Sequence, residues 1–275
     1  MFTLKDNLQP FREIAYLFQR HRQLILEMAK REITDRYKGQ VLGNVWAILH
    51  PLTLMGVYIF IFVFVFKIKI GANRNLPFDY TTYILSGLIP WLSLQEILGK
   101  ASTVIISHAN LVKQLVFPIA ILPIKSVISS LINQLIFLLI LIIYVSIAFQ
   151  KINLTFLLLP ILLFVQSLMM IGIAYILSAI GVYFKDIKDF VQIFTLIGVY
   201  LLPIFYLPEQ IPQIFQPLLY INPFSYIIWC YQDALYFGKF QHPFAWIVAI
   251  IMSHLIFSLG YKVFCKLQVM FGNLL

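Results

Sequence analysis

The feature that most constrains this chain is its set of long apolar stretches without charge. Between Val41 and Phe66 there is no Asp, Glu, Lys or Arg, and comparable runs recur through the 275 residues. A helix needs about 20 apolar residues to cross a bilayer, whereas a barrel strand needs about 10 alternating ones. Because these runs are long and continuous, the sequence predicts an all-α, polytopic membrane protein.

The composition agrees with a membrane protein. Hydrophobic residues make up 61% and charged residues 11% of the chain, whereas soluble domains carry about 25% charge. We interpret the net charge of +9 as Lys and Arg gathered in cytoplasmic loops rather than as a nucleic-acid surface. Cys230 and Cys265 lie far apart in the chain and are expected to be packing residues, not metal ligands.

The apolar runs predict one transmembrane domain over 1–275, with a six-span region over 44–266. Residues 208–242 hold prolines between apolar pieces too short to cross, which favours a re-entrant segment of outer helices. Residues 1–43 are expected to form a cytoplasmic interfacial helix and an elbow. An amphipathic helix packed on a soluble partner is the alternative. The six spans are expected at 44–66, 81–106, 126–149, 154–184, 190–207 and 243–264.

The distribution of basic residues predicts the orientation. Six spans place both termini on one side, and the loops of that side hold 15 of the 20 Lys and Arg residues. Cytoplasmic loops carry an excess of these residues. Both termini are therefore expected in the cytoplasm.

Few residues offer catalytic chemistry. No stretch fits the phosphate loop G-x-x-x-x-G-K-[ST], so the chain cannot be an ATPase by that route. Glu96 is the only acid well inside a predicted span, and Lys100, one turn later, can pair with it. His50 has no second ligand beside it in the sequence. Because no paired acid and base or nucleophile motif occurs, an enzyme is disfavoured, and no cofactor is expected in this chain.

Aromatic residues make up 16% of the chain. Belts at the two membrane interfaces would account for them. The alternative is a conduit wall with flat apolar faces edged by hydroxyls, which suits sugars. The residues considered as substrate-conduit lining are Tyr58, Phe62, Phe66, Trp91, Tyr200 and Tyr206.

The stretch "REITDRYKGQVLGNVWAILHP" at 31–51 resembles the entry motif of bacterial type-2 ABC exporter permeases that move lipid-linked polysaccharides. That family has an Arg-acidic pair, an Arg-Tyr pair, Leu-Gly-x-x-Trp and a proline. The matching residues are Arg31-Glu32, Arg36-Tyr37, Leu42-Gly43, Trp46 and Pro51. Within this motif Gly43 is expected to permit close helix approach.

Three further stretches are similar to the same family, in order along the chain. Residues 89–123 resemble its second span and first cytoplasmic connection. In "YFKDIKDF" at 183–190, Lys185-Asp186 stands where the family often has Arg-Asp, which keeps the charge but loses the planar guanidinium. Residues 203–238 resemble the end of its fifth span and its re-entrant helices, with Asn222-Pro223 in place.

This resemblance implies a homodimer with two separately encoded ATPase subunits that bind ATP and Mg. The cytoplasmic loops would dock them through Asn110, Lys113, Lys185, Asp186 and Asp189. Near the elbow, Arg31, Arg36, Tyr37 and Lys38 would meet lipid headgroups or an anionic pyrophosphate linker. Plain positive-inside bias is the alternative for Arg36 and Lys38.

The function expected from the resemblance is export of a polyprenyl-diphosphate-linked polysaccharide. O-antigen export across a Gram-negative inner membrane is the first expectation, and capsule or teichoic acid export is the second. An ion-coupled carrier or a membrane enzyme acting on lipid-linked sugars is the alternative from another class.

Overall fold

A computed structural model describes residues 4–36, 38–65, 77–113 and 117–275. Over these residues every regular element is a helix and no strand occurs, which confirms the all-α class. Tyr37 and Phe66, two of the predicted site residues, lie outside the described residues.

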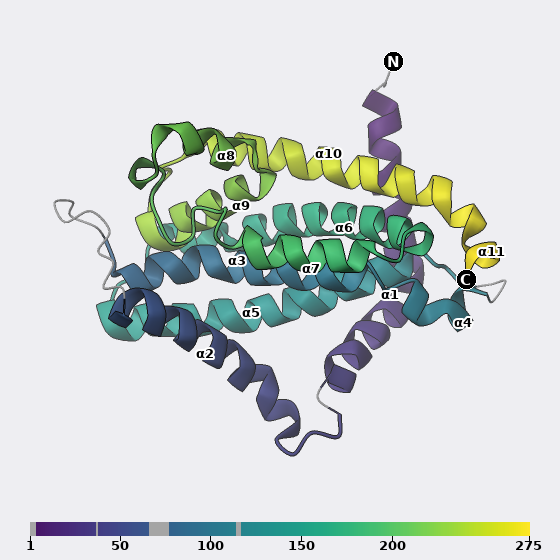
Figure 1. The fold of residues 1–275 in the computed structure, drawn as a ribbon, viewed down its shortest axis with the longest axis horizontal. Helices are drawn as coiled ribbons and strands as arrows, with labels where there is room; N and C mark the ends of the chain where they lie inside the picture. Colours follow the sequence, from purple (N-terminus) through teal and green to yellow (C-terminus); the bar gives the residue numbers. More distant parts are fainter. Residues whose placement is uncertain (1–3, 37, 66–76, 114–116) are drawn as a thin grey trace.

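The core of the fold is a bundle of helices with roughly aligned axes, crossed by one long helix (Figure 1). The crossing helix is α1 (Leu4–Arg36), which has a kink at His21. After α1 the chain turns back through the elbow into α2 (Trp46–Ile59), which continues as a π-helical segment over Phe60–Val65. The bundle helices are α3 (Tyr80–Ala101), α5 (Ile121–Phe149), α6 (Leu159–Tyr183), α7 (Ile187–Gly198) and α10 (Pro243–Leu267).

The bundle has two distinct ends. The short helices α4 (Ala109–Val112) and α11 (Phe271–Leu274) lie at one end together with the C-terminus, and we name it the α4 end (Figure 1). The short helices α8 (Gln216–Ile221) and α9 (Pro223–Gln232) lie towards the other end of the bundle, the end at which α2 also finishes. We name this the α9 end.

Three helical segments in the described part of the chain are long and apolar enough to cross a membrane. They are Ile121–Phe149, Leu154–Tyr183 and Pro243–Leu274. They coincide with the predicted third, fourth and sixth spans. A shorter apolar helix, Trp46–Phe62, lies within the predicted first span.

The predicted fifth span, 190–207, differs from the structure in its second half. The helix α7 ends at Gly198, and turns follow up to Tyr206. Here side chains of neighbouring helices satisfy the backbone carbonyls. The Tyr80 hydroxyl donates to the Phe205 carbonyl at 2.6 Å, and the Gln232 amide donates to the Pro203 carbonyl at 2.6 Å. Such bonds stabilise irregular backbone inside a membrane protein.

The proline-rich segment 208–242 forms short helical pieces, as its broken apolar pattern predicts. The α9 helix starts at Asn222-Pro223, where the Asn222 side chain accepts a hydrogen bond from the Phe224 amide at 3.1 Å. A π-helical segment, Asp233–Phe237, follows. Residues 224–236 are all buried, so this segment is part of the packed core. Its re-entrant position in a membrane stays a prediction.

Two glycines let α6 and α10 pack closely against each other. A Cβ added at Gly260 in α10 would lie 2.1 Å from the carbonyl oxygen of Gly172 in α6, which no side chain tolerates. Small residues at such crossings let two membrane helices pack closely. Gly43 was expected to serve this purpose, but an added Cβ there meets nothing within 4 Å among the described atoms. Its φ of +47° instead shows a left-handed turn at the elbow.

Candidate functional site

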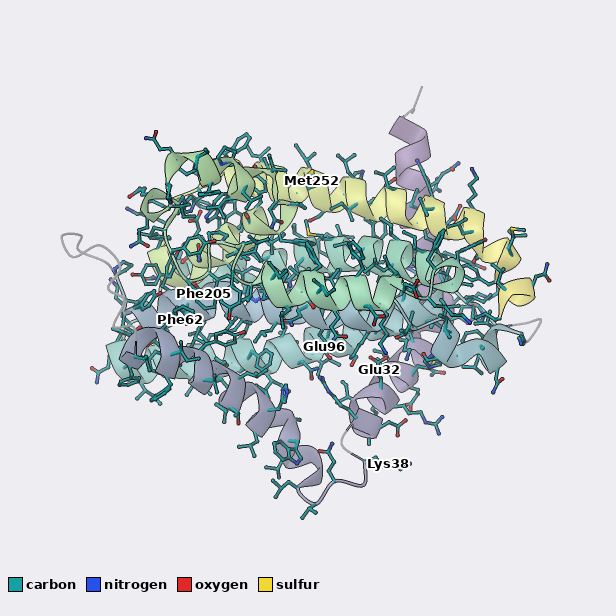
Figure 2. All side chains as sticks on the ribbon, viewed as in Figure 1. Glu32, Lys38, Phe62, Glu96, Phe205 and Met252 are labelled. Atoms are coloured by element: carbon teal, nitrogen blue, oxygen red, sulfur yellow. The ribbon has the colours of Figure 1, made fainter. Side chains whose placement is uncertain are left out.

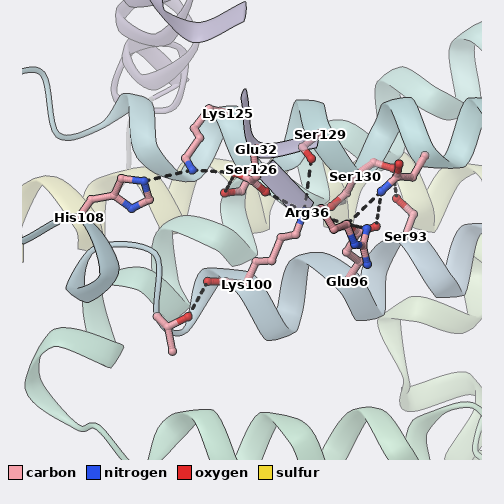
Figure 3. Close-up of polar contacts among 12 residues, drawn as sticks. Glu32, Arg36, Ser93, Glu96, Lys100, His108, Lys125, Ser126, Ser129 and Ser130 are labelled. Atoms are coloured by element: carbon pink, nitrogen blue, oxygen red, sulfur yellow. Dashed lines mark hydrogen bonds and ion pairs between the residues drawn. The ribbon is translucent and has the colours of Figure 1, made fainter. Parts of the chain in front are cut away.

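Three helices bring five charged side chains together beside the elbow, and we name this group the charged cluster (Figure 3). Glu32 and Arg36 are one turn apart on α1, so they face the bundle together. Glu96 and Lys100 have the same spacing on α3, and their side chains pair at 2.7 Å, which confirms the predicted ion pair. Lys125 is the fifth residue of α5.

Glu32 is held on several sides. Its carboxylate lies 2.7 Å from the Lys100 Nζ and 2.7 Å from the Lys125 Nζ, and it accepts a hydrogen bond from Ser126 at 3.1 Å. Burial alone would raise the pKa of Glu32, but the two ammonium groups outweigh it and lower the pKa to about 2. Glu32 is therefore ionised at neutral pH and compensates Lys125, whose side chain is only 6% exposed.

Glu96 is the junction between all three helices. Its carboxylate accepts from the Arg36 guanidinium at 2.9 Å and pairs with Lys100. The Asn133 amide of α5 donates to both carboxylate oxygens at 3.0 Å. The α3 carboxylate thus joins the end of α1 to α5, a contact that local sequence spacing did not predict.

His108 lies at the edge of the charged cluster. Its Nδ1 is 2.9 Å from the Val104 carbonyl, so this nitrogen carries the proton. The Nε2 atom then faces the Lys125 ammonium at 3.4 Å as an acceptor. Burial and the charge of Lys125 lower the pKa of His108. His108 is therefore neutral at pH 7 and adds no charge to the cluster.

A cavity of about 230 Å³ opens between the elbow and the bundle. Arg36, His50, Glu96 and Asn133 give it a polar side, and the rest of its wall is mostly apolar. A wider groove of about 720 Å³ beside the elbow shares Arg36 and His50. The apolar lining of the cavity comes from Ala47, Pro51, Leu54, Leu92 and Phe137. Such a site can hold a small polar group attached to an apolar one.

A second group, the aromatic cluster, lies towards the α9 end. It consists of Tyr58, Phe62, Tyr200, Phe205 and Tyr206. The rings of Phe62 and Phe205 are stacked with centroids 4.0 Å apart (Figure 2). Tyr58 and Tyr200 lie 5.6 and 5.9 Å from Phe205, and the Tyr206 hydroxyl donates to the Tyr200 carbonyl at 2.6 Å. Four predicted conduit residues therefore gather around one that was not predicted.

Trp91, another predicted conduit residue, is separate from this cluster. Its side chain has no exposed surface, and its ring packs edge-on against Phe224 at 6.0 Å. A Cβ on Gly198 would lie 2.6 Å from the same ring. In this conformation Trp91 therefore belongs to the core between α3 and α7 and contributes no open surface.

The predicted docking residues are all exposed in the single chain. Asn110 and Lys113 belong to the α4 region, and Lys185, Asp186 and Asp189 belong to the turn and first residues of α7. In the elbow region, Arg31 and Lys38 are also exposed. Arg31 pairs with Asp35 at 3.9 Å on the surface of α1, whereas Lys38 lies at the elbow, away from the bundle (Figure 2).

Possible metal ligands and thiols in the described part of the chain are not gathered into one site. Within the described ranges, no group of three or more His, Cys, Asp or Glu side chains is arranged to hold a metal ion. Cys230 is buried and Cys265 is half-buried, and both are free thiols. The charged cluster pairs its carboxylates with cations, an arrangement that positions helices.

Several curated proteins are similar to this chain over most of its length. Two O-antigen export system permease proteins RfbA of Klebsiella pneumoniae are 24% and 26% identical to it, each over 95% of this chain and 97% of the relative. An RfbA protein of Myxococcus xanthus is 27% identical over 82% of this chain and 84% of its own length.

The family comparison covers the same region as the two clusters. Residues 23–236 match the family described as ABC-2 type transporter. This range extends from the second half of α1, which carries Glu32 and Arg36, to the π-helical segment after α9. Together with its apolar helices, the match identifies a multi-pass membrane protein of the transporter class: the chain belongs to the ABC-2 type transporter family.

Proposed function

We propose that this chain is the permease subunit of an ATP-driven exporter of polyprenyl-diphosphate-linked polysaccharide, with O-antigen as the cargo. The observation that carries the proposal is its similarity to O-antigen export permeases over 82% to 95% of the chain. Capsule or teichoic acid export is the second candidate, because the sequence motifs resemble those exporters equally.

The orientation proposed for the molecule places the α4 end in the cytoplasm and the α9 end outside the inner membrane. The α2 helix and the five bundle helices would cross the bilayer as six spans. The crossing direction of α1 (Figure 1) would then lay it along the cytoplasmic interface, as its amphipathic sequence predicts.

ATP hydrolysis would take place in a separate subunit. This chain lacks a phosphate loop, so two copies of a partner ATPase would bind ATP and Mg beneath a homodimer of permeases. The exposed residues Asn110, Lys113, Lys185, Asp186 and Asp189 would form the docking surface. Short connections on rigid helices can transmit a rigid-body shift from such a partner.

The cargo would meet the two clusters in turn. At the elbow, Arg36 and Lys38 would attract the anionic diphosphate of the lipid linker, because basic side chains near headgroups gain about 1 kcal/mol each. At the α9 end, the rings of Tyr58 and Phe62 would offer flat faces to the sugars. The hydroxyls of Tyr200 and Tyr206 would add polar edges to this path.

Complementation tests the proposed function. In a strain that lacks this chain, the wild-type gene should restore polymer at the cell surface. Alanine at both Tyr58 and Phe62 should lower surface polymer while the protein still assembles in the membrane. Phe60→Ala, at an exposed ring nearby, is the matched control. Normal export by the double variant would show that these two rings do not line the path of the cargo. If the wild-type gene restores export of neither O-antigen, capsule nor teichoic acid in the matching strains, the proposed function is contradicted.

Docking of the ATPase is tested separately. Lysine at both Asp186 and Asp189 should reduce copurification of the ATPase, because the surface charge reverses at the proposed contact. Lys151→Glu changes an exposed charge before α6, far in the chain from this turn, and serves as the control. Equal copurification of both variants would exclude the turn as a docking surface.

A further inference from the structure

Two side chains of α1 enter the charged cluster, and they differ in how firmly they are held. We infer that the Arg36–Glu96 ion pair is an exchangeable latch: a phosphate group entering the cavity takes Arg36 from Glu96, while Glu32 keeps α1 attached. The inference rests on the proposed function only for the source of that phosphate. In this inference, the elbow changes its attachment when the Arg36 guanidinium exchanges the Glu96 carboxylate for a phosphate.

Glu32 is the permanent attachment. Its side chain is 16% exposed and contacts two lysines and one serine from two different helices. Removing it would leave Lys125 buried with no carboxylate beside it in the cluster. Breaking a buried pair by removing one partner is strongly destabilising, so this contact does not open easily.

Arg36 is the exchangeable attachment. Its side chain is 38% exposed, and it lines both the cavity and the wider groove. Its guanidinium can bind a phosphate through two parallel hydrogen bonds, a geometry that a lysine does not offer. An anion that reaches the cavity therefore meets Arg36 without first displacing a helix.

Glu96 can release Arg36 without becoming unpaired. It keeps the Lys100 ammonium at 2.7 Å and the Asn133 amide at 3.0 Å. An unpaired buried carboxylate would strongly oppose the exchange. Since these two donors remain on Glu96, Arg36 can exchange the carboxylate for a phosphate, and no buried charge is left without a partner.

The charge balance of the cluster favours an incoming anion. Arg36, Lys100 and Lys125 carry three positive charges, whereas Glu32 and Glu96 carry two negative ones. His108 faces this group as a neutral ring. The surplus positive charge lies where water is partly excluded, so it attracts an anion more strongly than an exposed arginine would.

The exchange would act on the elbow. Arg36 is the last residue of α1, and the chain continues directly into the turn that leads to α2. When Arg36 turns to the phosphate, the end of α1 loses its ion pair to α3. Glu32, one turn earlier, still holds α1 to α3 and α5, so the elbow is loosened while the helix stays in place.

Binding to the purified full-length chain tests the latch. The chain is placed in nanodiscs of phosphatidylcholine, and the binding of farnesyl diphosphate and of inorganic pyrophosphate is titrated by calorimetry. Glu96→Gln removes the competing charge and should tighten binding by about 3- to 10-fold, because charge-assisted hydrogen bonds are about twice as strong as neutral ones. Arg36→Gln should abolish binding.

A conservative change at Arg36 provides an independent test. Arg36→Lys keeps a positive charge beside Glu96 but loses the guanidinium, which can bind a phosphate through two parallel hydrogen bonds. The variant should stay folded in a thermal unfolding measurement, yet it should bind both probes more weakly than the wild type. This variant remains informative even if Glu96→Gln folds poorly.

The outcomes of these experiments distinguish a failure of the latch from a failure of the proposed export function. Unchanged or weaker probe binding by Glu96→Gln would overturn the latch, as would absence of binding to the wild type. Either result leaves the complementation test of export untouched. If binding needs the farnesyl group, the lipid linker is the source of phosphate. Competition by added phosphatidylglycerol would instead assign the latch to bulk anionic lipid.

Discussion

The charged cluster joins α1 to the bundle, whereas the aromatic cluster joins α2 and its π-helical continuation to the bundle, and the two contacts depend on different forces. In the charged cluster, five charged side chains from three helices meet in fixed pairs at 2.7 to 2.9 Å. In the aromatic cluster, rings from α2 meet an irregular segment at centroid distances of 4.0 to 5.9 Å. Ion pairs can exchange one partner for another, whereas stacked rings can slide and still remain in contact.

This difference matters in a bilayer, where the hydrophobic effect does not drive helices together. Close packing and polar contacts have to fix the helix positions instead. The charged cluster defines discrete arrangements of α1 on the bundle. The aromatic cluster leaves the α2 contact at the α9 end more tolerant, which suits a surface along which a cargo passes.

The largest effect is expected from Glu32→Leu. This change leaves Lys100 and Lys125 without a carboxylate that both contact, so we expect a loss of about 3–5 kcal/mol of stability. Titration with sodium dodecyl sulfate from mild detergent, followed by circular dichroism, would measure it. Asp35→Asn is the control, because the exposed Arg31–Asp35 pair is worth about 1 kcal/mol or less. A similar loss of stability in both variants would show that the buried Glu32 contributes no more than the exposed Arg31–Asp35 pair.

The aromatic cluster should lose less on removal of its central ring. Phe205 is 3% exposed, and Phe205→Ala is expected to cost about 3 kcal/mol through lost contacts and an unfilled cavity. The same detergent titration measures it. Phe60→Ala removes an exposed ring and should stay within about 0.5 kcal/mol of the wild type. A cost for Phe205→Ala as small as that of the control would mean that the ring is not central.

The sequence predicts the parts of these clusters that depend on local spacing. Glu96 and Lys100 pair because they are one turn apart on a helix, and three of the apolar runs form long helices at the places predicted for the third, fourth and sixth spans. The broken helices after Pro208 follow from prolines between short apolar pieces. In each case a period or a helix-breaking residue within a few positions is sufficient evidence.

Contacts between distant segments could not be predicted in the same way. Glu32 meets Lys125 because α1 crosses α5, and no periodicity of either segment reveals that crossing. Phe205 was missed because the apolar run through Pro203 predicts a continuing helix. In the structure Tyr80 and Gln232, from other elements, stabilise a turn there. A single sequence does not show which distant donors will satisfy a free carbonyl.

Acid should remove the contribution of Glu32 and leave the aromatic cluster unchanged. The pKa of Glu32 is lowered from 4.5 to about 2, so its stabilisation is complete above about pH 4.5 and is lost as the pH falls through 2. The stability difference between wild type and Glu32→Gln should be on the order of 2–3 kcal/mol at neutral pH. Detergent titrations between pH 7 and pH 2 would measure it. A difference that grows towards low pH would contradict the sign of this pKa shift.

The smallest effect concerns the stacked rings themselves. A double-mutant cycle of Phe62→Ala and Phe205→Ala isolates their coupling energy from the burial of each ring. Their interplanar angle of 9° at 4.0 Å predicts a coupling of about 0.5–1.5 kcal/mol. If the cluster tolerates sliding, Phe62→Leu should retain most of the stability, because an apolar side chain of similar length still covers Phe205. At the charged cluster, by contrast, Arg36→Lys should lose the guanidinium geometry. We therefore expect a side chain of different shape to be tolerated in the contact of Phe62 but not in that of Arg36.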